Sequence, residues 1–213
     1  MKTRVLSVNP TQPEPEAIRE ASQVLSQGGL VAFPTDTLYA LGANALDPRA
    51  VERVLTVKGR HHGKPLSVLL PSAALASELT VELPAAVRGL MEAFWPGPLT
   101  VVVRASSKAS PVIATAGGTV GLRVPAGPVA RSLLASFGGP VIGTSANKSG
   151  GADPGDARAV QKAIGGQIDL ILDGGRVALG IPSTVIDCTS EPARILREGA
   201  VPRSELARSI PLA

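Results

Sequence analysis

Residues 28–60 read GGLVAFPTDTLYALGANALDPRAVERVLTVKGR, and this stretch decides the predicted fold. Residues 30–33 form a short apolar run between a Gly-Gly pair and a proline, which predicts a strand buried on both of its faces. Thr35, Asp36 and Thr37 follow at once, where an open α/β sheet usually carries its ligands, beyond the carboxyl end of a strand. The stretch therefore predicts the floor and one wall of a binding site.

A helix is predicted after this polar turn. Asp47 and Pro48 have the residue types of an N-cap and a first helical position. Lys58 and Arg60 stand where the helical pattern ends. Cations are favoured at helix C-termini by the helix dipole, so position alone leaves two explanations open for the pair, dipole complementarity and a role in a site.

Composition favours one compact globular domain over residues 1–213. Hydrophobic residues make up 44% of the chain, yet no apolar run approaches the length of a membrane-spanning helix. The first ten residues lack the apolar core of a signal peptide. The single cysteine, Cys188, excludes an internal disulfide and a cysteine-built zinc site. We therefore expect a cytoplasmic protein that does not bind membranes.

The charge pattern gives weak support to a nucleic-acid partner. The net charge is +4 and the isoelectric point is near 9.6, but the 21 lysines and arginines are scattered singly. Aromatic residues amount to 2%, which leaves few side chains on which single-stranded bases could stack. A stacking type of RNA binder is disfavoured, whereas weak RNA binding by a basic face stays open.

Strand and helix patterns alternate along the rest of the chain. Strands are predicted at residues 66–70, 99–103, 119–124, 141–143 and 168–172, and helices at residues 17–25, 72–79, 84–94, 130–137, 156–164 and 203–210. Residues 183–188 and 193–196 are predicted to pair as a closing hairpin. Because the hairpin strands are joined without a helix, the predicted architecture is α/β with a twisted, open, mixed sheet flanked by helices.

Familiar catalytic motifs are missing. No GxxxxGK[ST] and no GxGxxG follows a predicted strand, and residues 143–147 lack the closing glycine of a nucleophile elbow. Ser145 and Lys148 match the short Ser-x-x-Lys pattern without its companion motifs. The two histidines, His61 and His62, are adjacent, and two neighbours do not make a metal site without further ligands.

The candidates for a functional site are therefore polar and cationic residues at predicted strand and helix ends. The set comprises Thr35, Lys58, Arg60, Thr119, Arg123, Ser145, Asn147, Ser183 and Arg197. Each has a structural explanation when taken singly. Ser145 can cap a turn, Asn147 can hold a left-handed backbone, and Arg197 can pair with Glu198 or Asp187 at the surface.

Six motifs around these residues are combined in one known family. They are GGLVAFPTDTLYALGANA, Lys58-x-Arg60, Phe94-Trp95-Pro96-Gly97-Pro98-Leu99-Thr100, Gly121-Leu122-Arg123-Val124-Pro125, Ser145-x-Asn147, and Pro182-Ser183-Thr184-Val185 with Ile195-Leu196-Arg197. The chain resembles the YrdC-like family, the threonylcarbamoyl-AMP synthases that supply the threonylcarbamoyl modification of tRNA adenosine beside the anticodon. The resemblance extends over about residues 17–201. It is to the short form of the family, so we expect no additional C-terminal domain.

The resemblance implies a concave, electropositive face of the sheet that binds ATP with Mg²⁺, L-threonine and bicarbonate. The nucleotide side would be lined by Lys58, Arg60, Thr119, Ser145, Asn147 and Arg197, with Lys58 and Arg60 as the catalytic pair. Threonine would be held by Thr35, Arg123 and Ser183. The product would pass to the proteins that transfer the threonylcarbamoyl group to tRNA. Residues 105–118 and 149–155 are the candidate loops for excluding water from a product that hydrolyses readily.

The chain departs from the family pattern at two positions. His61 stands where a proline is common after the Lys-x-Arg pair, and Leu69 stands where some members carry a histidine. Two other functions remain as alternatives. One is a double-stranded RNA or ribosome-binding module with a basic face, and the other is a nucleotide-dependent carbamoyl transfer to a different acceptor, as in hydrogenase maturation proteins.

Overall fold

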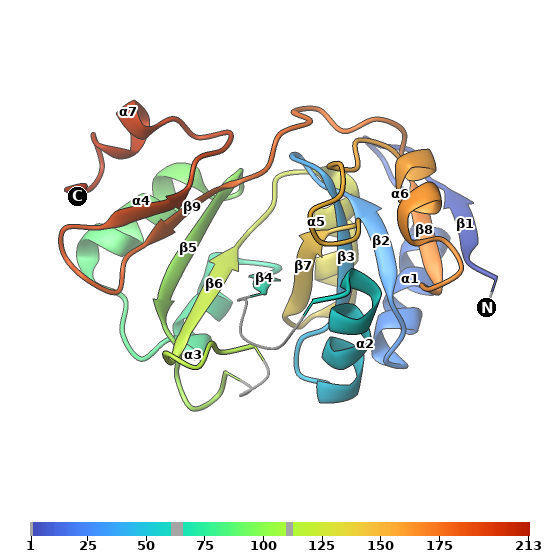
Figure 1. Cartoon of the computed structure of the whole chain (residues 1–213), viewed down its shortest axis with the longest axis horizontal. Coiled ribbons are helices and arrows are strands. Elements are labelled where there is room, and N and C mark those ends of the chain that lie inside the picture. Colours follow the sequence, from blue (N-terminus) through green and yellow to red (C-terminus); the bar gives the residue numbers. More distant parts are fainter. Residues whose placement is uncertain (1, 61–65, 110–112) are drawn as a thin grey trace.

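The computed structural model describes residues 2–60, 66–109 and 113–213, and in these ranges the strands form one ten-stranded sheet (Figure 1). The order across the sheet is β1-β8-β2-β3-β7-β4-β6-β5-β9-β10. The strands are β1 (Arg4–Ser7), β2 (Val31–Pro34), β3 (Tyr39–Asn44), β4 (Ser67–Leu69), β5 (Leu99–Arg104), β6 (Thr119–Arg123), β7 (Val141–Ser145), β8 (Leu170–Asp173), β9 (Thr184–Asp187) and β10 (Arg194–Arg197). Parallel and antiparallel pairs both occur, so the prediction of a mixed α/β sheet is confirmed.

Helices cover both faces of this sheet. They are α1 (Pro15–Ser26), α2 (Pro48–Lys58), α3 (Ala76–Leu79), α4 (Ala85–Phe94), α5 (Pro128–Phe137), α6 (Ala157–Ile164) and α7 (Arg203–Leu206), with a short 3-10 turn η1 (Ala73–Leu75). Apolar residues of α1 and α5 pack together in one core cluster, and those of α2, α4 and α6 belong to the other. Figure 1 shows α2 and α6 in front of the sheet and α5 behind it.

Strand β2 lies between these two clusters. All four of its residues are buried, as the apolar run predicted. Leu30, which precedes the strand, and Ala32 belong to the cluster with α2, whereas Val31 and Phe33 belong to the cluster with α1. Side chains alternate across a strand, so a continuous apolar run serves both faces. The polar turn at residues 35–37 therefore leaves the centre of the core.

Strand β3 was not predicted. Its sequence, YALGAN, contains glycine and small residues that have low strand propensity. It pairs antiparallel with β2 on one side and β7 on the other. A Cβ at Gly42 would lie 2.6 Å from Phe33 Cε1, so only glycine leaves room for the Phe33 ring. Pairing with two neighbours thus forms this strand despite its low intrinsic propensity.

Strand β1 was also missed, and two predicted helices are shorter than expected. Three of the four β1 residues are exposed, and the strand pairs with β8, about 165 residues later, which no local pattern reports. The helix expected at residues 72–79 is divided into η1 and α3, and the one expected at residues 203–210 ends as α7 at Leu206. The closing hairpin of β9 and β10 is confirmed as an antiparallel pair.

The ends of α2 place the Lys-x-Arg pair. Asp47 Oδ1 accepts a hydrogen bond of 2.9 Å from the N–H of Arg49, which confirms the predicted N-cap. Gly59 ends the helix with φ of 60°, a left-handed conformation that favours glycine. The N–H of Arg60 donates to the carbonyl of Leu55 at 3.0 Å, so Lys58 is the last residue of the helix and Arg60 lies just beyond it.

Candidate functional site

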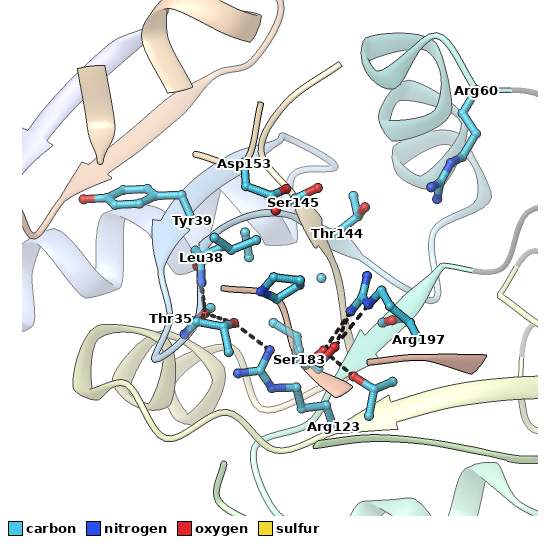
Figure 2. Close-up of a pocket in the computed structure, with 17 residues that line it drawn as sticks. Thr35, Leu38, Tyr39, Arg60, Arg123, Thr144, Ser145, Asp153, Ser183 and Arg197 are labelled. Atoms are coloured by element: carbon cyan, nitrogen blue, oxygen red, sulfur yellow. Dashed lines mark hydrogen bonds between the residues drawn. The ribbon is translucent and has the colours of Figure 1, made fainter. Parts of the chain in front are cut away.

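A hollow of about 340 Å³ opens beside the polar turn that follows β2 (Figure 2). Its lining comes from many parts of the chain that are far apart in sequence. The lining residues are Thr35, Thr37, Leu38, Tyr39, Ala40, Arg60, Ser67, Leu69, Thr100, Arg123, Gly143, Thr144, Ser145, Asp153, Pro182, Ser183 and Arg197. These include three arginines and one carboxylate among the described lining residues, so the pocket is electropositive.

Arg123 ends β6 inside this pocket, and its guanidinium is held from three directions. It is 6% exposed. Nε donates to the carbonyl of Gly97 at 2.9 Å, Nη1 to Thr37 Oγ1 at 2.9 Å and Nη2 to Asp36 Oδ1 at 2.6 Å. Because a guanidinium has five N–H groups, these contacts with described residues leave one hydrogen on each Nη for a ligand. Two such groups match the two oxygens of a carboxylate.

The turn that follows β2 carries two hydroxyls next to Arg123. Thr35 Oγ1 donates to the carbonyl of Leu38 at 2.7 Å and accepts from the N–H of Thr37 at 3.1 Å. The hydroxyls of Thr35 and Thr37 are 3.0 Å apart. Short hydroxyl side chains favour turns because they replace backbone partners in this way. The local sequence therefore builds a rigid polar wall.

Arg197 and Ser183 form a second polar cluster in the pocket wall (Figure 2). Arg197 donates to the carbonyl of Ser183 through Nε at 3.1 Å and through Nη2 at 2.8 Å, and Nη2 lies 3.0 Å from Ser183 Oγ. Ser183 Oγ is also 2.9 Å from Thr100 Oγ1. Among the described residues, then, the contacts of Arg197 lead into the pocket, and a surface ion pair with Glu198 or Asp187 is not formed.

The residues predicted for the nucleotide side divide into two groups. Arg60, Ser145 and Arg197 line the pocket. Lys58, Asn147 and Thr119 do not belong to its lining. All three residues predicted for threonine, Thr35, Arg123 and Ser183, lie in the pocket wall.

Lys58 lies directly behind the pocket wall. It is 2% exposed. Its Nζ donates to the carbonyl of Ser145 at 2.6 Å, to the carbonyl of Asn147 at 3.0 Å and to Asn147 Oδ1 at 3.2 Å. An ammonium has three hydrogens, so all of them are used by one short segment. Lys58 therefore holds the segment that carries Ser145 against α2.

Asn147 extends the same network into the loop that follows. Its Oδ1 accepts from Ser145 Oγ at 2.7 Å, and its Nδ2 donates to the carbonyls of Gly151 and Ala152, each at 2.9 Å. No described residue other than glycine has a positive φ, so Asn147 does not hold a left-handed backbone. The Ser145-x-Asn147 pattern instead fixes the loop at residues 148–152.

Burial changes the protonation equilibria of these cations. Burial, with a smaller contribution from the neighbouring Arg60, lowers the pKa of Lys58 to about 8. Burial also lowers the pKa of Arg60, while Asp153 partly offsets the same effect on the pKa of Arg197. The Nε of Arg60 is buried without a hydrogen-bond partner in the described part of the chain. A guanidinium in this condition favours an anionic ligand.

Thr119 lies at the start of β6, away from the pocket lining. Its hydroxyl is 2.8 Å from that of Thr115. It opens the strand that Arg123 ends. Of residues 105–118, none that the structure describes lines the pocket.

Several polar lining residues lie outside the set predicted from the sequence, among them Tyr39, Thr100 and Asp153. The hydroxyl of Tyr39 donates to the carbonyl of Gly175 at 2.7 Å, and burial raises the pKa of Tyr39. The N–H of Tyr39 donates to the carbonyl of Pro154 at 2.9 Å, which brings Asp153 to the pocket. Tyr39 stands two residues after the polar turn, and that proximity was the one available signal.

Leu69 forms an apolar part of the pocket wall. A Cβ at Gly143 would lie 2.2 Å from Leu69 Cγ, so the two residues are in close contact. Leu69 therefore occupies space that a side chain at position 143 would need. The second departure, His61, lies outside the described residues.

Comparison with known proteins assigns the chain to one family. The sequence profile of the Sua5/YciO/YrdC family, described as telomere recombination, matches residues 23–199. The chain belongs to this family. It is 41% identical over 193 residues to a threonylcarbamoyl-AMP synthase of Pyrococcus abyssi, a match that covers 91% of this chain and 57% of that relative. The chain thus spans a little over half the length of this relative.

Solved structures agree with this membership. The structure of P. abyssi Sua5 complexed with L-threonine superposes with a TM-score of 0.94 at 38% identity, over 99% of this chain and 63% of that one. Escherichia coli YciO superposes with a TM-score of 0.87 at 27% identity, over 94% and 97% of the two chains. The single-domain fold with a mixed open sheet is therefore the fold of the family.

The described residues were also searched for membrane-spanning helices and for clusters of metal-binding side chains. Among them, no helix is long and apolar enough to cross a membrane. The same residues contain no group of three or more His, Cys, Asp or Glu side chains arranged to hold a metal ion.

Proposed function

We propose that this chain is an enzyme that condenses L-threonine, bicarbonate or CO2, and ATP to threonylcarbamoyl-AMP and pyrophosphate, which makes it a nucleotidyltransferase. One observation carries the proposal. The pocket holds a carboxylate-matching guanidinium, Arg123, and two further arginines, Arg60 and Arg197, around one cavity. A site of this kind suits a small amino acid beside a polyphosphate.

Threonine would occupy the end of the pocket formed by Arg123, Thr35 and Ser183. The two uncommitted N–H groups of Arg123 would hold the substrate carboxylate in a bidentate contact. The hydroxyls of Thr35 and Ser183 are fixed by their own hydrogen bonds and would orient the amine and the side-chain hydroxyl. Threonine would therefore enter with one orientation.

ATP would occupy the end formed by Arg60, Arg197 and Ser145. Lys58 would contribute by holding Ser145, and Asn147 by holding the loop, rather than by touching phosphate directly. Mg²⁺ bound to a nucleotide often needs only one or two protein carboxylates because phosphate oxygens supply other ligands. The residues fit this requirement, since Asp153 lies in the wall of the pocket.

The proposed reaction needs no covalent bond between the substrates and the protein. The amine of threonine adds to CO2, loses a proton and gives a carbamate. An oxygen of the carbamate then attacks the α-phosphorus of ATP, and the bond to the β-phosphate oxygen breaks to release pyrophosphate. Negative charge spreads over phosphate oxygens in this step, so arginines held in place beforehand stabilise it. Mg²⁺ would supply further charge compensation for the leaving pyrophosphate.

The product would serve the threonylcarbamoyl modification of tRNA adenosine next to the anticodon. It is a mixed anhydride, so it transfers its acyl group readily and hydrolyses readily. The proteins that carry out the transfer to tRNA would therefore act soon after release. The loop at residues 149–155 borders the pocket through Asp153 and would limit the access of water.

The test is pyrophosphate release from MgATP, with threonine and bicarbonate omitted one at a time. We expect release to require both. Release that needs neither would contradict the proposal, and release that accepts carbamoyl phosphate in place of threonine and bicarbonate would favour the carbamoyl-transfer alternative. Binding of double-stranded RNA that falls steeply with salt and ignores ATP would favour the RNA-binding alternative.

A further inference from the structure

Asp36 and Arg123 form a buried ion pair beside the wall of the pocket. Nη2 of Arg123 lies 2.6 Å from Asp36 Oδ1, and the two side chains are 7% and 12% exposed. Asp36 Oδ1 also accepts a hydrogen bond of 3.1 Å from the N–H of Ala126. One carboxylate oxygen therefore joins the turn after β2 to the segment after β6.

A contribution to stability does not by itself explain why the carboxylate of Asp36 is buried. Its second oxygen, Oδ2, is buried and has no hydrogen-bond partner among the described residues. An unsatisfied buried carboxylate oxygen is unfavourable, and a buried ion pair often contributes no more than an apolar pair of the same shape. Asp36 does not belong to the lining of the pocket, so it does not face a ligand there itself. Its contact with the site passes through Arg123.

We propose that Asp36 is a positioning residue for the carboxylate end of the substrate, acting through Arg123. This inference rests on the function proposed above. Three acceptors, the Gly97 carbonyl, Thr37 Oγ1 and Asp36 Oδ1, each use one N–H group of Arg123. Because these contacts fix the plane of the guanidinium, the two remaining N–H groups, one on each Nη atom, point in fixed directions. Of the three acceptors only Asp36 is charged, and charge-assisted hydrogen bonds are the stronger ones.

The charge of Asp36 has a second consequence. The Asp36–Arg123 pair is neutral as a whole. Among the described residues no carboxylate lies within ion-pair distance of Arg60 or Arg197, and Arg197 is influenced only by the more distant Asp153. A polyphosphate is therefore attracted more strongly to the end of the pocket that carries Arg60 and Arg197. The neutralised end is left for a monocarboxylate. Asp36 thus separates the two substrate positions as well as orienting one of them.

The experiment compares Asp36→Asn with Asp36→Glu and with a matched control, Asp169→Asn. Asparagine keeps an acceptor oxygen for Arg123 and Ala126 but removes the charge. Asp169 makes an equivalent arrangement outside the pocket, because its Oδ2 accepts from Arg53 Nη2 at 2.8 Å and from the N–H of Leu30 at 2.7 Å. The control therefore measures the effect of removing the charge from a carboxylate that pairs with an arginine outside the pocket.

Threonine binding by calorimetry and the KM values in pyrophosphate release are measured on each full-length variant. For Asp36→Asn we expect the Kd and KM for threonine to rise about tenfold or more, the loss of one charge-assisted contact, with the KM for ATP changed less than about twofold. Asp36→Glu should recover most of the threonine affinity. Asp169→Asn should lower the melting temperature and leave both KM values unchanged.

A double-mutant cycle tests whether the effect passes through Arg123. In an Arg123→Lys background, Asp36→Asn should add little to the threonine KM, because the planar guanidinium that Asp36 orients is absent. Full additivity would overturn the positioning role. So would an unchanged threonine affinity in Asp36→Asn, or an equal rise in both KM values. If the parent protein binds no threonine at all, the proposed function fails together with this inference, which is a separate and recognisable outcome.

Discussion

Arg123 and Arg60 line the same pocket but differ in how their charges are satisfied. Arg123 donates to three acceptors, one of them the carboxylate of Asp36. Arg60 has a buried Nε that finds no acceptor in the described part of the chain. Burial lowers the pKa of both guanidinium groups, and only for Arg123 does a paired carboxylate counteract the effect.

The difference indicates two uses of the same side chain. A guanidinium that is held by several acceptors cannot move to follow a ligand, so it suits the orientation of a small, asymmetric molecule. A guanidinium without partners keeps its full attraction for an anion and suits a site where negative charge develops. Orientation and charge stabilisation are thus separated between the two ends of one cavity.

The strongest test of this separation is Arg60→Ala. Because Arg60 would meet charge on the phosphates in the transition state, we expect pyrophosphate release to fall by roughly 10² to 10³, the range for loss of one preorganised donor. The melting temperature should change little, since the Nε of Arg60 has no partner to lose among the described residues. Steady-state kinetics and a thermal melt on the same preparation measure both.

Arg53→Ala provides the control for Arg60→Ala. Arg53 donates to the carbonyl of Gly28 and to Asp169, both at 2.8 Å, outside the pocket. This variant should melt earlier and release pyrophosphate at the parent rate. An Arg60→Ala variant that behaves like Arg53→Ala would remove Arg60 from the catalytic machinery.

Arg123→Lys should raise the threonine requirement without a comparable effect on ATP. Lysine keeps the positive charge but loses the planar fork that matches a carboxylate. We expect the KM for threonine to rise by roughly 10- to 100-fold, equivalent to one bidentate contact, while the KM for ATP stays nearly constant. An unchanged threonine dependence would show that Arg123 does not hold the substrate.

Lys58→Met should combine loss of stability with loss of activity. Complementing the helix dipole alone would contribute only about 0.3 to 1 kcal/mol. The three acceptors that Lys58 uses at Ser145 and Asn147 would be left without it, and we expect the free energy of unfolding to fall by about 1 to 3 kcal/mol. Release of pyrophosphate should fall by about tenfold because the wall that carries Ser145 loosens. Parent stability combined with a large loss of turnover would instead indicate direct contact with phosphate.

The smallest expected effect is the pH dependence of stability contributed by Lys58. Its pKa is about 8 in the folded chain, against 10.5 for an unperturbed lysine. Between these values the unfolded chain binds more protons than the folded chain, so stability rises with pH in this window. Relative to Lys58→Met, the parent should gain about 1 kcal/mol in free energy of unfolding between pH 7 and pH 9. Denaturant titrations at both pH values measure the difference, and a parallel course of the two proteins would contradict the lowered pKa.

The residues that make the site could be identified from the sequence more easily than their roles could. Thr35, Arg123 and Ser183 were predicted together from motifs, and they do line one pocket. Lys58 and Asn147 were predicted beside ATP by the same reasoning, and the structure shows them behind the wall, bonded to each other. A motif records which residues belong together and does not say which of them faces the cavity.

Local signals explain the features that were predicted well. The apolar run of β2, the N-cap at Asp47 and the glycine at position 59 each depend on neighbours within about one helical turn, so a short window of sequence contains the whole cause. The predicted helices and strands follow from the same short-range periodicity. None of these features depends on a contact between distant parts of the sequence.

Tertiary structure alone decided the partners of the buried charges. Asp36 meets Arg123, and Lys58 meets Ser145, each across 87 residues of chain. Both contacts depend on the sheet order, in which the unpredicted strand β3 lies between β2 and β7. A buried charge takes the partner that the packed sheet brings within about 3 Å, and its cost of desolvation makes that partner obligatory. The charged residues can be identified from the sequence, whereas the strand order determines which partners they contact.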